Sequence, residues 1–594
     1  MKKSLLLIPI SALALAALIG CTKTEPFDLD PSGNVSGGTT HTDIVVDDTG
    51  DEPEVTASGA FSLKLGSNAI TATDNVYTIT EAGEYDAAGV LENGQIIVNA
   101  PEDAEVVINL NGASISCSTD SPIKALSADK LEISAKKKTT NLIEDTRSEK
   151  GADSDSTLGE GAINAKCDLK LKGAGTLVVR GNYNNGVHTT KDLEIQKETL
   201  YVTAINNALK GKNSISITSG TVTAISKKGN GLKTDNTDIS SKGKQRGTIT
   251  VEGGTLVVDS AYDAIDAAYN IVVTELVDSE TNEVTSPTKI TAKTGANSTY
   301  SANYDGSTSA KGLKADNQID ISAGSIAIKA SDDAIHANYG DAFDNGSTGL
   351  GNVNVSGGQI GIASGDDGIH ADNTLTISDG IIDITGSAEG IEATHIDIQG
   401  GSTCIYGSDD GVNASKKINE TPTVKISGGF LDVSVTAGDT DGIDSNGNFE
   451  MTGGFVVSRG SPGNPRGMST GLDCEGTAKI AGGTFIAFNG MEKTPSTGTG
   501  VLYAKYNVTQ GGGGPGGPGG GGRPSAPAGT VSFNAGVYTL TGGDLLKTFE
   551  NDQTYSNFII YSSEMSIGTA YTLSRDEMVL LSWTQSKSST TITL

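Results

Sequence analysis

A repeating tripeptide is the feature that most restricts how this chain folds. A glycine or alanine is followed by Ile, Leu or Val and then by a polar residue, and many neighbouring copies lie 21 to 24 residues apart. The central residues of the copies are Ile163, Val187, Leu209, Leu232, Ile265, Leu313, Ile335, Ile369, Ile391, Val412, Ile443 and Leu472. A fixed period of this length is typical of a repeat architecture, in which each copy is one supersecondary unit stacked on the next.

Glycine pairs recur between the tripeptides and divide each repeat into strands. They lie at residues 253–254, 357–358, 400–401, 428–429, 453–454 and 482–483. Runs in which apolar and polar residues alternate flank them, and this period of two indicates β-strands. Each repeat of about 22 residues therefore holds three short strands. A β-sandwich array or a propeller is the alternative, but a propeller blade needs about 40 residues and four strands.

We accordingly predict an all-β chain that forms a single-stranded parallel β-helix. One repeat makes one turn of the helix, here called a rung, and rungs stack at the strand spacing of about 4.8 Å. We expect a right-handed helix, although nothing in the sequence itself fixes the hand. Because a solenoid exposes backbone and core at its end, we also expect a small β-rich cap at the C-terminus.

The first 57 residues are predicted to export and tether the protein. Residues 1–21 begin with a basic pair, continue with an apolar run and end in Leu-Ile-Gly-Cys, which is typical of a lipoprotein signal peptide and lipobox. A transmembrane anchor is the alternative, but the apolar run is short. We expect cleavage before Cys21, acylation of its thiol, and a flexible acidic tether over residues 22–57. This predicts a lipid-anchored protein of a bacterial membrane, at the outer membrane or the cell surface.

Composition divides the remaining chain and limits its partners. We assign residues 58–510 to the β-helix, 511–529 to a Gly/Pro-rich loop and 530–594 to the cap. The net charge of −30 argues against nucleic acid and against anionic lipid surfaces, so the lipid is the only expected membrane contact. We expect a monomer. Four cysteines besides Cys21 show no metal-binding spacing, and most are expected to be free packing residues: Cys117, Cys167, Cys404 and Cys474.

The residue that precedes each tripeptide forms a column when the rungs stack. Its first half holds three consecutive asparagines, Asn185, Asn207 and Asn230, which predict an amide ladder along the stack. Later copies place acids in or beside the column: Asp263, Asp266, Asp332, Asp333, Asp366, Asp367, Glu389, Asp409, Asp410, Asp441 and Asp444. Carboxylates about 5 Å apart repel one another unless a cation lies between them or some are protonated. We therefore predict calcium, which prefers six to eight oxygen ligands, over a merely solvated acidic edge.

Two histidines and two lysines interrupt the acids. His336 and His370 share one position of the repeat, where we expect stacked imidazoles and regard a zinc site as the alternative. Lys311 and Lys314 are embedded in the acidic columns. They are weak candidates for the base of a lyase, and charge compensation of the neighbouring acids is the favoured interpretation.

The repeated motifs resemble a known family. They are SDDAIHA (331–337), GDDGIHAD (365–372), SDDGVNAS (408–415) and DTDGIDSNG (439–447), together with the Gly/Pro segment and the C-terminal region. The chain resembles bacterial carbohydrate-binding domain-containing proteins, which are related to pectate-lyase-like right-handed β-helices. The resemblance implies an extracellular polysaccharide-binding β-helix that binds calcium along its turns.

We therefore expect a calcium-dependent polysaccharide-binding lipoprotein that favours acidic, uronic-acid or plant-cell-wall-type glycans. The chain has 5% aromatic residues and one Trp, so an aromatic platform for neutral sugars is poorly supported. A bound metal ion would reverse the local repulsion between acidic protein and acidic glycan. A calcium-dependent polysaccharide lyase and a structural or adhesive surface protein are the two alternatives. Glycosidase chemistry by paired carboxylates stays open, because the acids offer too many pairs to choose one.

Overall fold

The structure is a computed structural model that describes residues 44–152, 154–295, 307–343, 346–436, 438, 440–462, 469–506 and 531–593. These residues contain strands and no helix, so the predicted all-β class is confirmed. They form two compact units, one of residues 44–397 and 415–420, the other of residues 398–414 and those from 421 onward. Cys21, residues 22–43 and the Gly/Pro-rich segment 511–529 lie outside the described residues.

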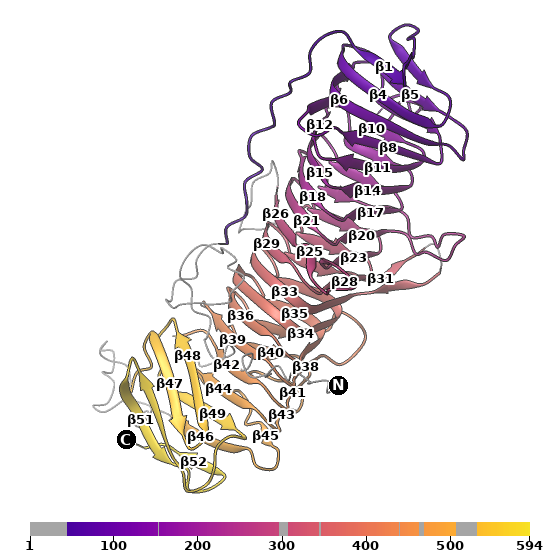
Figure 1. Ribbon diagram of the computed structural model, residues 1–594. Coiled ribbons are helices and arrows are strands. Elements are labelled where there is room, and N and C mark those ends of the chain that lie inside the picture. Colours follow the sequence, from indigo (N-terminus) through magenta and orange to yellow (C-terminus); the bar gives the residue numbers. More distant parts are fainter. Residues whose placement is uncertain are drawn as a thin grey trace, which may run out of the picture. The chain divides into compact units, whose positions relative to one another are not determined.

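The first unit is a coil in which strands of successive turns pair in parallel, and from β7 to β20 each strand pairs with the third strand after it (Figure 1). The first column carries the tripeptides and contains β7 (Ile123–Ser127), β10 (Gly161–Ala165), β13 (Asn185–Thr189), β16 (Leu209–Gly211), β19 (Leu232–Lys233), β22 (Ile265–Ala267), β27 (Leu313–Ala315), β30 (Ile335–Ala337) and the start of β34 (Ile369–Ser387). The second column contains β8 (Lys130–Ala135), β11 (Asp168–Gly173), β14 (Asp192–Gln196), β17 (Ser214–Ile217), β20 (Thr248–Val251), β23 (Asn270–Val273), β28 (Gln318–Ile321) and the first half of β33 (Asn352–Ser364). The third column contains β9 (Thr140–Asp145), β12 (Thr176–Gly181), β15 (Glu198–Ala204), β18 (Gly220–Ser226), β21 (Gly254–Ser260), β26 (Thr288–Thr294), β29 (Ser325–Ala330) and the second half of β33.

The register follows the sequence repeat residue by residue. Ile335 pairs with Ile369 on one side and with Leu313 on the other, so the central residues of the tripeptides stack. These side chains are fully buried along the first column, whereas the polar residues that follow them are partly exposed in some rungs and buried in others. Burial of one apolar face fixes the register, because a slip by one residue would expose every core side chain.

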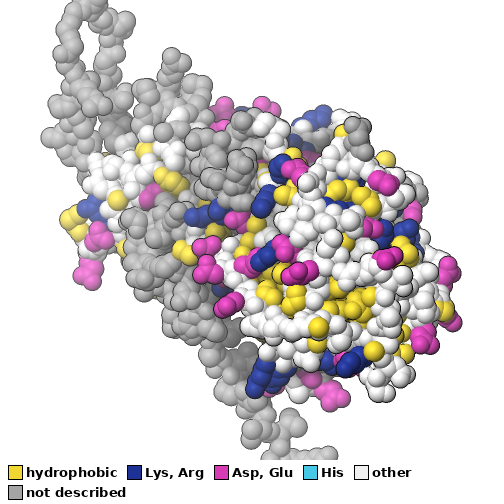
Figure 2. All heavy atoms as spheres, turned by 90° about the horizontal axis from the view of Figure 1, so that it is seen from above, with side chains coloured by type: hydrophobic (Ala, Val, Ile, Leu, Met, Phe, Trp, Pro, Cys, Tyr) yellow, Lys and Arg dark blue, Asp and Glu magenta, His cyan; other side chains and the backbone are white. Residues whose placement is uncertain are grey.

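The N-terminal end of the coil is built from longer strands. These are β1 (Ser62–Leu65), β2 (Asn68–Ala69), β3 (Val76–Ile79), β4 (Gly83–Leu91), β5 (Gln95–Asn99) and β6 (Glu105–Cys117). β1 pairs in antiparallel with β2 and β4, while β4 pairs in parallel with β6. The rings of Phe61 and Tyr77 pack edge to face with centroids 5.0 Å apart. Seen from above, hydrophobic, acidic and basic side chains lie intermixed on this face (Figure 2).

Residues 44–57, here called the N-terminal strap, lie along the outside of the third column (Figure 1). Ile44 packs against Ala327 and Ala363, whereas Val55 packs against a cluster that includes Val178. Two ion pairs hold the strap between these contacts, from Lys289 to Asp47 at 2.8 Å and from Arg180 to Glu52 with Nε 3.0 Å from Oε1. This part of the predicted tether therefore has defined contacts with the coil.

Two hairpins leave the coil of the first unit. β24 (Leu276–Val277) pairs with β25 (Val284–Ser286), and β31 (Tyr339–Ala342) pairs with β32 (Thr348–Leu350), both in antiparallel. The second hairpin lies between the first and the second column, directly after β30. β35 (Ile391–Ile398) ends this unit's run of strands.

The second unit continues the parallel pattern and then closes it. Its coil strands are β36 (Ser402–Gly407), β37 (Val412–Ala414), β38 (Thr423–Ile426), β39 (Phe430–Val435), β40 (Ile443–Ser445), β41 (Asn448–Met451), β42 (Phe455–Arg459), β43 (Ala478–Ile480), β44 (Thr484–Phe488), β45 (Ser496–Thr497) and β46 (Leu502–Tyr506). The C-terminal strands are β47 (Gly536–Gly542), β48 (Leu545–Asn551), β49 (Phe558–Ser562), β50 (Ala570–Arg575), β51 (Met578–Thr584) and β52 (Ser589–Thr591). β49 pairs in antiparallel with both β44 and β46, which covers the free edge of the last parallel strand.

Glycine is required where rungs approach closely at the glycine pairs. Gly429 has a φ of 76°, and a Cβ atom there would lie 2.6 Å from the carbonyl oxygen of Gly400 in the preceding rung. Gly454 has a φ of 85° and makes the same approach to Gly428. Any other residue would meet both a steric clash and an unfavourable backbone conformation.

Three of the four cysteines among the described residues serve packing, and the fourth, Cys404, is disulfide-bonded. Cys117, Cys167 and Cys474 are buried and free. Burial raises the pKa of the Cys167 thiol to about 11, so this thiol is unreactive at neutral pH. Within the described parts of the chain, no helix is long and apolar enough to cross a membrane.

Candidate functional site

A recess of about 400 Å³ opens on the first column of the first unit. Its lining is called the acidic cluster here: Lys311, Asp332, Asp333, His336, Asp366, Asp367, His370, Glu389, Glu392 and Lys417. Six carboxyl groups face two ammonium groups and two imidazoles in this set. Negative charge is therefore in excess, whichever way the two histidines are protonated.

The repeat itself brings these side chains together. Asp332 and Asp333 precede β30, Asp366 and Asp367 precede β34, and Glu389 precedes β35. Since β30 and β34 pair in register, the acids of one turn stack on those of the next. The backbone N–H of Asp367 donates to Oδ1 of Asp333 at 3.0 Å, which ties the two turns directly.

That contact is of the same kind as a ladder in the earlier rungs, which ends at Lys311 because this side chain has no accepting oxygen and the N–H of Asp333 donates to Asp332 Oδ1 instead. The N–H of Asn207 donates to Oδ1 of Asn185, and the N–H of Asn230 donates to Oδ1 of Asn207, both at 3.2 Å. Asp263 continues the series by donating to Oδ1 of Asn230 at 3.0 Å. The predicted amide ladder is thus confirmed. Asn and Asp are interchangeable for this purpose, because either side chain supplies the accepting oxygen.

Two lysines neutralise part of the cluster. The Nζ of Lys311 lies 2.7 Å from Asp332 Oδ1 and 2.7 Å from Asp333 Oδ2. The Nζ of Lys417 lies 2.7 Å from Glu392 Oε2. Burial opposes the charge of Lys311, but Asp333 and Asp332 raise its pKa well above the usual value. Lys311 is therefore an ammonium donor at neutral pH and unsuited to remove a proton from a substrate.

The two histidines stack within the cluster. The ring centroids of His336 and His370 lie 4.3 Å apart with an interplanar angle of 9°, which confirms the predicted stack. His336 Nδ1 lies 2.5 Å from Asp333 Oδ2, and His370 Nδ1 lies 2.7 Å from Asp367 Oδ2. Burial lowers the pKa of His336, whereas hydrogen bonds to Asp367 and Asp372 overcome burial and raise the pKa of His370 to about 10.

Ligand atoms of Asp333, His336 and His370 lie within 4.8 Å of one another, but the stacked rings do not favour a zinc site. Both Nδ1 atoms are directed at carboxylates, and two parallel imidazoles cannot aim their lone pairs at one tetrahedral ion between them. At neutral pH a charged His370 and a neutral His336 share the cluster. The imidazolium of His370 offsets one further carboxylate.

Three carboxyl groups remain without a lysine. Ligand atoms of Asp366, Asp367 and Glu389 all lie within 4.8 Å of one another, and so do those of Asp332, Asp333 and Asp366. Oδ1 of Asp367 is buried and has no hydrogen-bond partner among the described residues. Burial, with repulsion from Asp333 and Asp332, raises the pKa of Asp366 to about 6. Burial, repulsion from Asp333 and the contact with the Glu389 carboxyl group raise the pKa of Asp367 above its usual range.

These features are those expected of an ion-binding site made of oxygen ligands. A buried carboxylate oxygen without a partner costs free energy, and crowded carboxylates with raised pKa values cost more when they ionise. A divalent cation would relieve both costs. Asp366, Asp367 and Glu389 therefore fit calcium by their donor atoms, their proximity and their excess charge.

Two of the predicted ligands lie apart from the cluster and have protein partners. Asp266 contacts the ammonium of Lys233 and lies 3.4 Å from the Nζ of Lys314. Asp263 accepts the N–H of Lys311 at 2.8 Å and the hydroxyl of Ser309 at 2.6 Å. Protein groups therefore contact both side chains, although burial and repulsion from Asp266 raise the pKa of Asp263 to about 6.

Lys314 pairs with acids outside the cluster. Its Nζ lies 3.0 Å from Asp316 Oδ1, and Asp266 and Asp316 overcome burial to raise its pKa well above the usual value. The contacts of Lys311 and Lys314 are therefore those of charge compensation, which was the favoured interpretation of the sequence.

The remaining predicted acids, Asp409, Asp410, Asp441 and Asp444, belong to the second unit. Asp410 Oδ1 accepts the N–H of Asp441 at 2.7 Å, so the ladder is repeated there. Burial raises the pKa of Asp410 to about 8 and that of Asp441 to about 7. The described residues of this unit contain no three Asp, Glu, His or Cys ligand atoms within 4.8 Å of one another.

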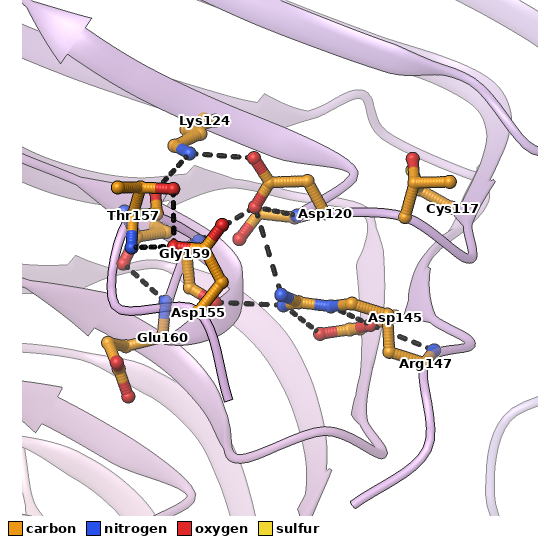
Figure 3. Close-up of polar contacts among 12 residues, drawn as sticks. Cys117, Asp120, Lys124, Asp145, Arg147, Asp155, Thr157, Gly159 and Glu160 are labelled. Carbon is orange, nitrogen blue, oxygen red and sulfur yellow. Dashed lines mark hydrogen bonds and ion pairs between the residues drawn. The ribbon is translucent and has the colours of Figure 1, made fainter. Parts of the chain in front are cut away.

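A polar cluster at the loop before β10 shows how charge is balanced elsewhere in the first unit. Arg147 is buried, with Nη2 2.6 Å from Asp145 Oδ2, and Nη2 also donates to the carbonyl oxygen of Gly159 at 2.9 Å (Figure 3). Nearby, Lys124 Nζ lies 2.6 Å from Asp120 Oδ2. Asp145 and Asp120 thus each have a cation within the chain. The acidic cluster differs because its acids outnumber its bases.

The sequence did not identify every residue of the cluster. Lys417 belongs to residues 415–420, a loop outside the repeat. Nothing in the sequence therefore predicted its contact with Glu392. Asp372 was equally unforeseen, although it lies two residues beyond His370 and its Oδ1 is 3.3 Å from His370 Nε2.

Comparison with known proteins places these observations in a family. A family model for carbohydrate-binding domain-containing proteins matches residues 73–350 and 341–434. A protein of that description from Acetivibrio thermocellus is 30% identical over 199 residues, which is 34% of this chain and 65% of the relative. The match thus spans less than two thirds of the relative's length. A solved structure of a polysaccharide lyase-like protein from C. thermocellum, a gadolinium derivative, is 28% identical over 38% of this chain and 85% of that chain, with a TM-score of 0.34.

Proposed function

The chain belongs to the family of carbohydrate-binding domain-containing proteins, and from this membership we propose that it binds a polysaccharide through a calcium ion held at the acidic cluster. The observation that carries the proposal is the trio of Asp366, Asp367 and Glu389, in which the buried Oδ1 of Asp367 has no hydrogen-bond partner in the described part of the chain. Carboxylates in this number repel an acidic glycan, so acidic glycans need a cation between them and the protein. Uronic-acid polymers are the glycan class that this chemistry favours.

The chain's own residues orient and balance the site. The ladder contact from Asp367 to Asp333 fixes the turn that carries the proposed ligands. Lys311 and Lys417 neutralise acids at the two ends and leave the middle of the cluster negative. A bound calcium ion would supply the positive charge that the carboxylate of a uronate recognises.

The cluster favours binding over the lyase alternative. A lyase needs a base to take the proton beside the uronate carboxylate, and Lys311 and Lys314 were the candidates for it. Both are held as ammonium ions by neighbouring carboxylates, with pKa values above the usual one. With both lysines held as ammonium ions, binding of a glycan is the function that the cluster supports better than its cleavage. No observation favours the structural or adhesive alternative.

We also propose the handedness of the coil and the attachment of the protein to a membrane. The parallel pairing of each strand from β7 to β20 with the third strand after it supports a parallel β-helix, to which we assign a right-handed coil. The sequence of residues 1–21 supports export, acylation of Cys21 and attachment to a bacterial membrane by lipid. A single polysaccharide-binding coil, tethered in this way, would present the acidic cluster to glycans outside the cytoplasm.

An array of acidic and neutral glycans, probed with and without calcium, tests the proposed function. Binding to uronic-acid polymers should appear with calcium and vanish on chelation. Asp367→Asn should weaken calcium binding by about tenfold or more, because it removes one charged ligand. Asp263→Asn is the matched control, since Asp263 occupies the same ladder position outside the cluster. A protein that binds no calcium at millimolar concentration in calorimetry would disprove the ion site.

A further inference from the structure

Exposed aromatic rings are rare in the described part of the first unit. Its exposed large hydrophobic side chains include two aromatic ones, Tyr262 at 44% and Tyr339 at 49% exposure. An exposed aromatic ring offers a flat apolar face with a polar tip, which suits the apolar face of a pyranose ring. The position of each tyrosine relative to the acidic cluster therefore decides whether it can contact a glycan bound there.

Tyr339 begins the β31–β32 hairpin, whose base is fixed to the coil. Phe343 is buried and its ring centroid lies 5.0 Å from that of Tyr269. At the return strand, the N–H of Leu350 donates to Asn317 Oδ1, and Asn373 Nδ2 donates to the carbonyl oxygen of Leu350, both at 3.0 Å. The ring of Tyr339 is therefore displayed on a held support, which lowers the entropy lost when a ligand stacks on it.

The hairpin is linked to the cluster through one residue. The N–H of Tyr339 donates to Asp372 Oδ2 at 2.8 Å, and Asp372 Oδ1 lies 3.3 Å from His370 Nε2. Gly351 permits this approach, because its φ is 68° and a Cβ atom there would lie 2.8 Å from the Cβ of Tyr339. Tyr339 is thus connected through Asp372 to His370, and it lies at the edge of the surface that carries the stacked histidines.

We propose that Tyr339 is the aromatic contact of the glycan site, on which a sugar ring stacks while the polymer's acidic groups are held at the acidic cluster. The inference rests on the proposed function and adds a residue that sets which sugars fit. Tyr262 is a poorer candidate. It precedes β22, whose rung lies two rungs before that of β30, or about 10 Å along the coil.

Calorimetric titration of a short unbranched oligogalacturonate into the full chain, at saturating calcium, tests the inference. Tyr339→Ala should weaken binding of this probe by about three- to tenfold, the usual worth of one aromatic stacking contact. Tyr339→Phe keeps the ring and should bind within about twofold of the parent. Tyr262→Ala, equally exposed in the same unit, is the control and should leave binding unchanged. The calcium affinity of Tyr339→Ala should equal that of the parent.

Each of the other possible results shows whether the inference about Tyr339 or the proposed function is wrong. If Tyr339→Ala binds the probe as the parent does, the inference is wrong and the calcium-dependent function stands. If Tyr339→Ala loses calcium affinity as well, the hairpin acts through Asp372 on the cluster and Tyr339 is no glycan contact. If the parent binds no oligogalacturonate with calcium present, the proposed acidic-glycan function and the inference fall together.

Discussion

Replacing Lys311 by methionine should make the protein depend on calcium for its stability. The Nζ of Lys311 lies 2.7 Å from carboxylates of both Asp332 and Asp333, and the three side chains are 14%, 3% and 4% exposed. Removing one partner of a buried ion pair leaves uncompensated charge and costs about 3–5 kcal/mol. Protonation of Asp366, whose pKa is already raised to about 6, relieves part of that cost, so we expect the lower end of this range.

Calcium should restore most of the stability that the Lys311→Met variant loses. A ligand at one hundred times its dissociation constant adds about 2.7 kcal/mol to the free energy of unfolding. The ammonium of Lys311 also repels a cation at the neighbouring carboxylates, so Lys311→Met should bind calcium more tightly than the parent. Thermal unfolding in a chelator and in calcium, with calorimetric titration of the ion, measures both effects.

Lys314→Met provides the matched control. Lys314 pairs with Asp266 and Asp316 outside the acidic cluster, so its loss should also destabilise the protein but calcium should not rescue it. Equal rescue of the two variants by calcium would refute the reasoning. So would weaker calcium binding by Lys311→Met, because it would mean that the ammonium does not compete with the ion.

Three further predictions concern pH and the ends of the fold. Calcium affinity should fall as the pH drops through about 6, the raised pKa of Asp366, because protons then compete for the ligand; a calorimetric pH series that stays flat from 7 to 5 would contradict this. Burial raises the pKa of the fully buried Glu198 well above 4.5, so above pH 4.5 the folded form binds more protons than the unfolded form. The free energy of unfolding should therefore fall by up to about 1.4 kcal/mol per pH unit above 4.5. Glu198→Gln should remove this slope and be more stable at pH 7, as urea unfolding at several pH values would reveal. Deletion of residues 531–594 should expose the edges of β44 and β46 and sharply lower solubility, whereas deletion of 511–529 should change solubility and melting temperature little.

The sequence predicted the fold well because the repeat encodes it redundantly. Ile335 and Ile369 each occupy the centre of a tripeptide, and the structure pairs these same residues. Every rung must bury one such residue, so the register is specified many times over. The hairpins and the N-terminal strap were not predicted, because insertions and extended segments lie outside the period.

The candidate site was predicted only in part, because position in the repeat does not determine a side chain's partners. Asp263 and Asp367 occupy the same position, yet Asp263 accepts hydrogen bonds from Lys311 and Ser309 while Oδ1 of Asp367 has no partner among the described residues. That difference depends on which residues the neighbouring rungs and loops supply. Lys417 shows the same limit, since a loop with no repeat signal brings it to Glu392.

The N-terminal strap has a mechanical consequence. Any pull on the chain before residue 44 reaches the coil first at Ile44, beside Ala327 and Ala363, well away from the strands that begin the fold. The load then acts along the strap and is shared in shear by the Asp47 and Glu52 ion pairs and the contact of Val55. Contacts loaded together resist force better than contacts that open one at a time. A protein held by its N-terminus in a moving medium would therefore keep its first rungs out of the line of tension.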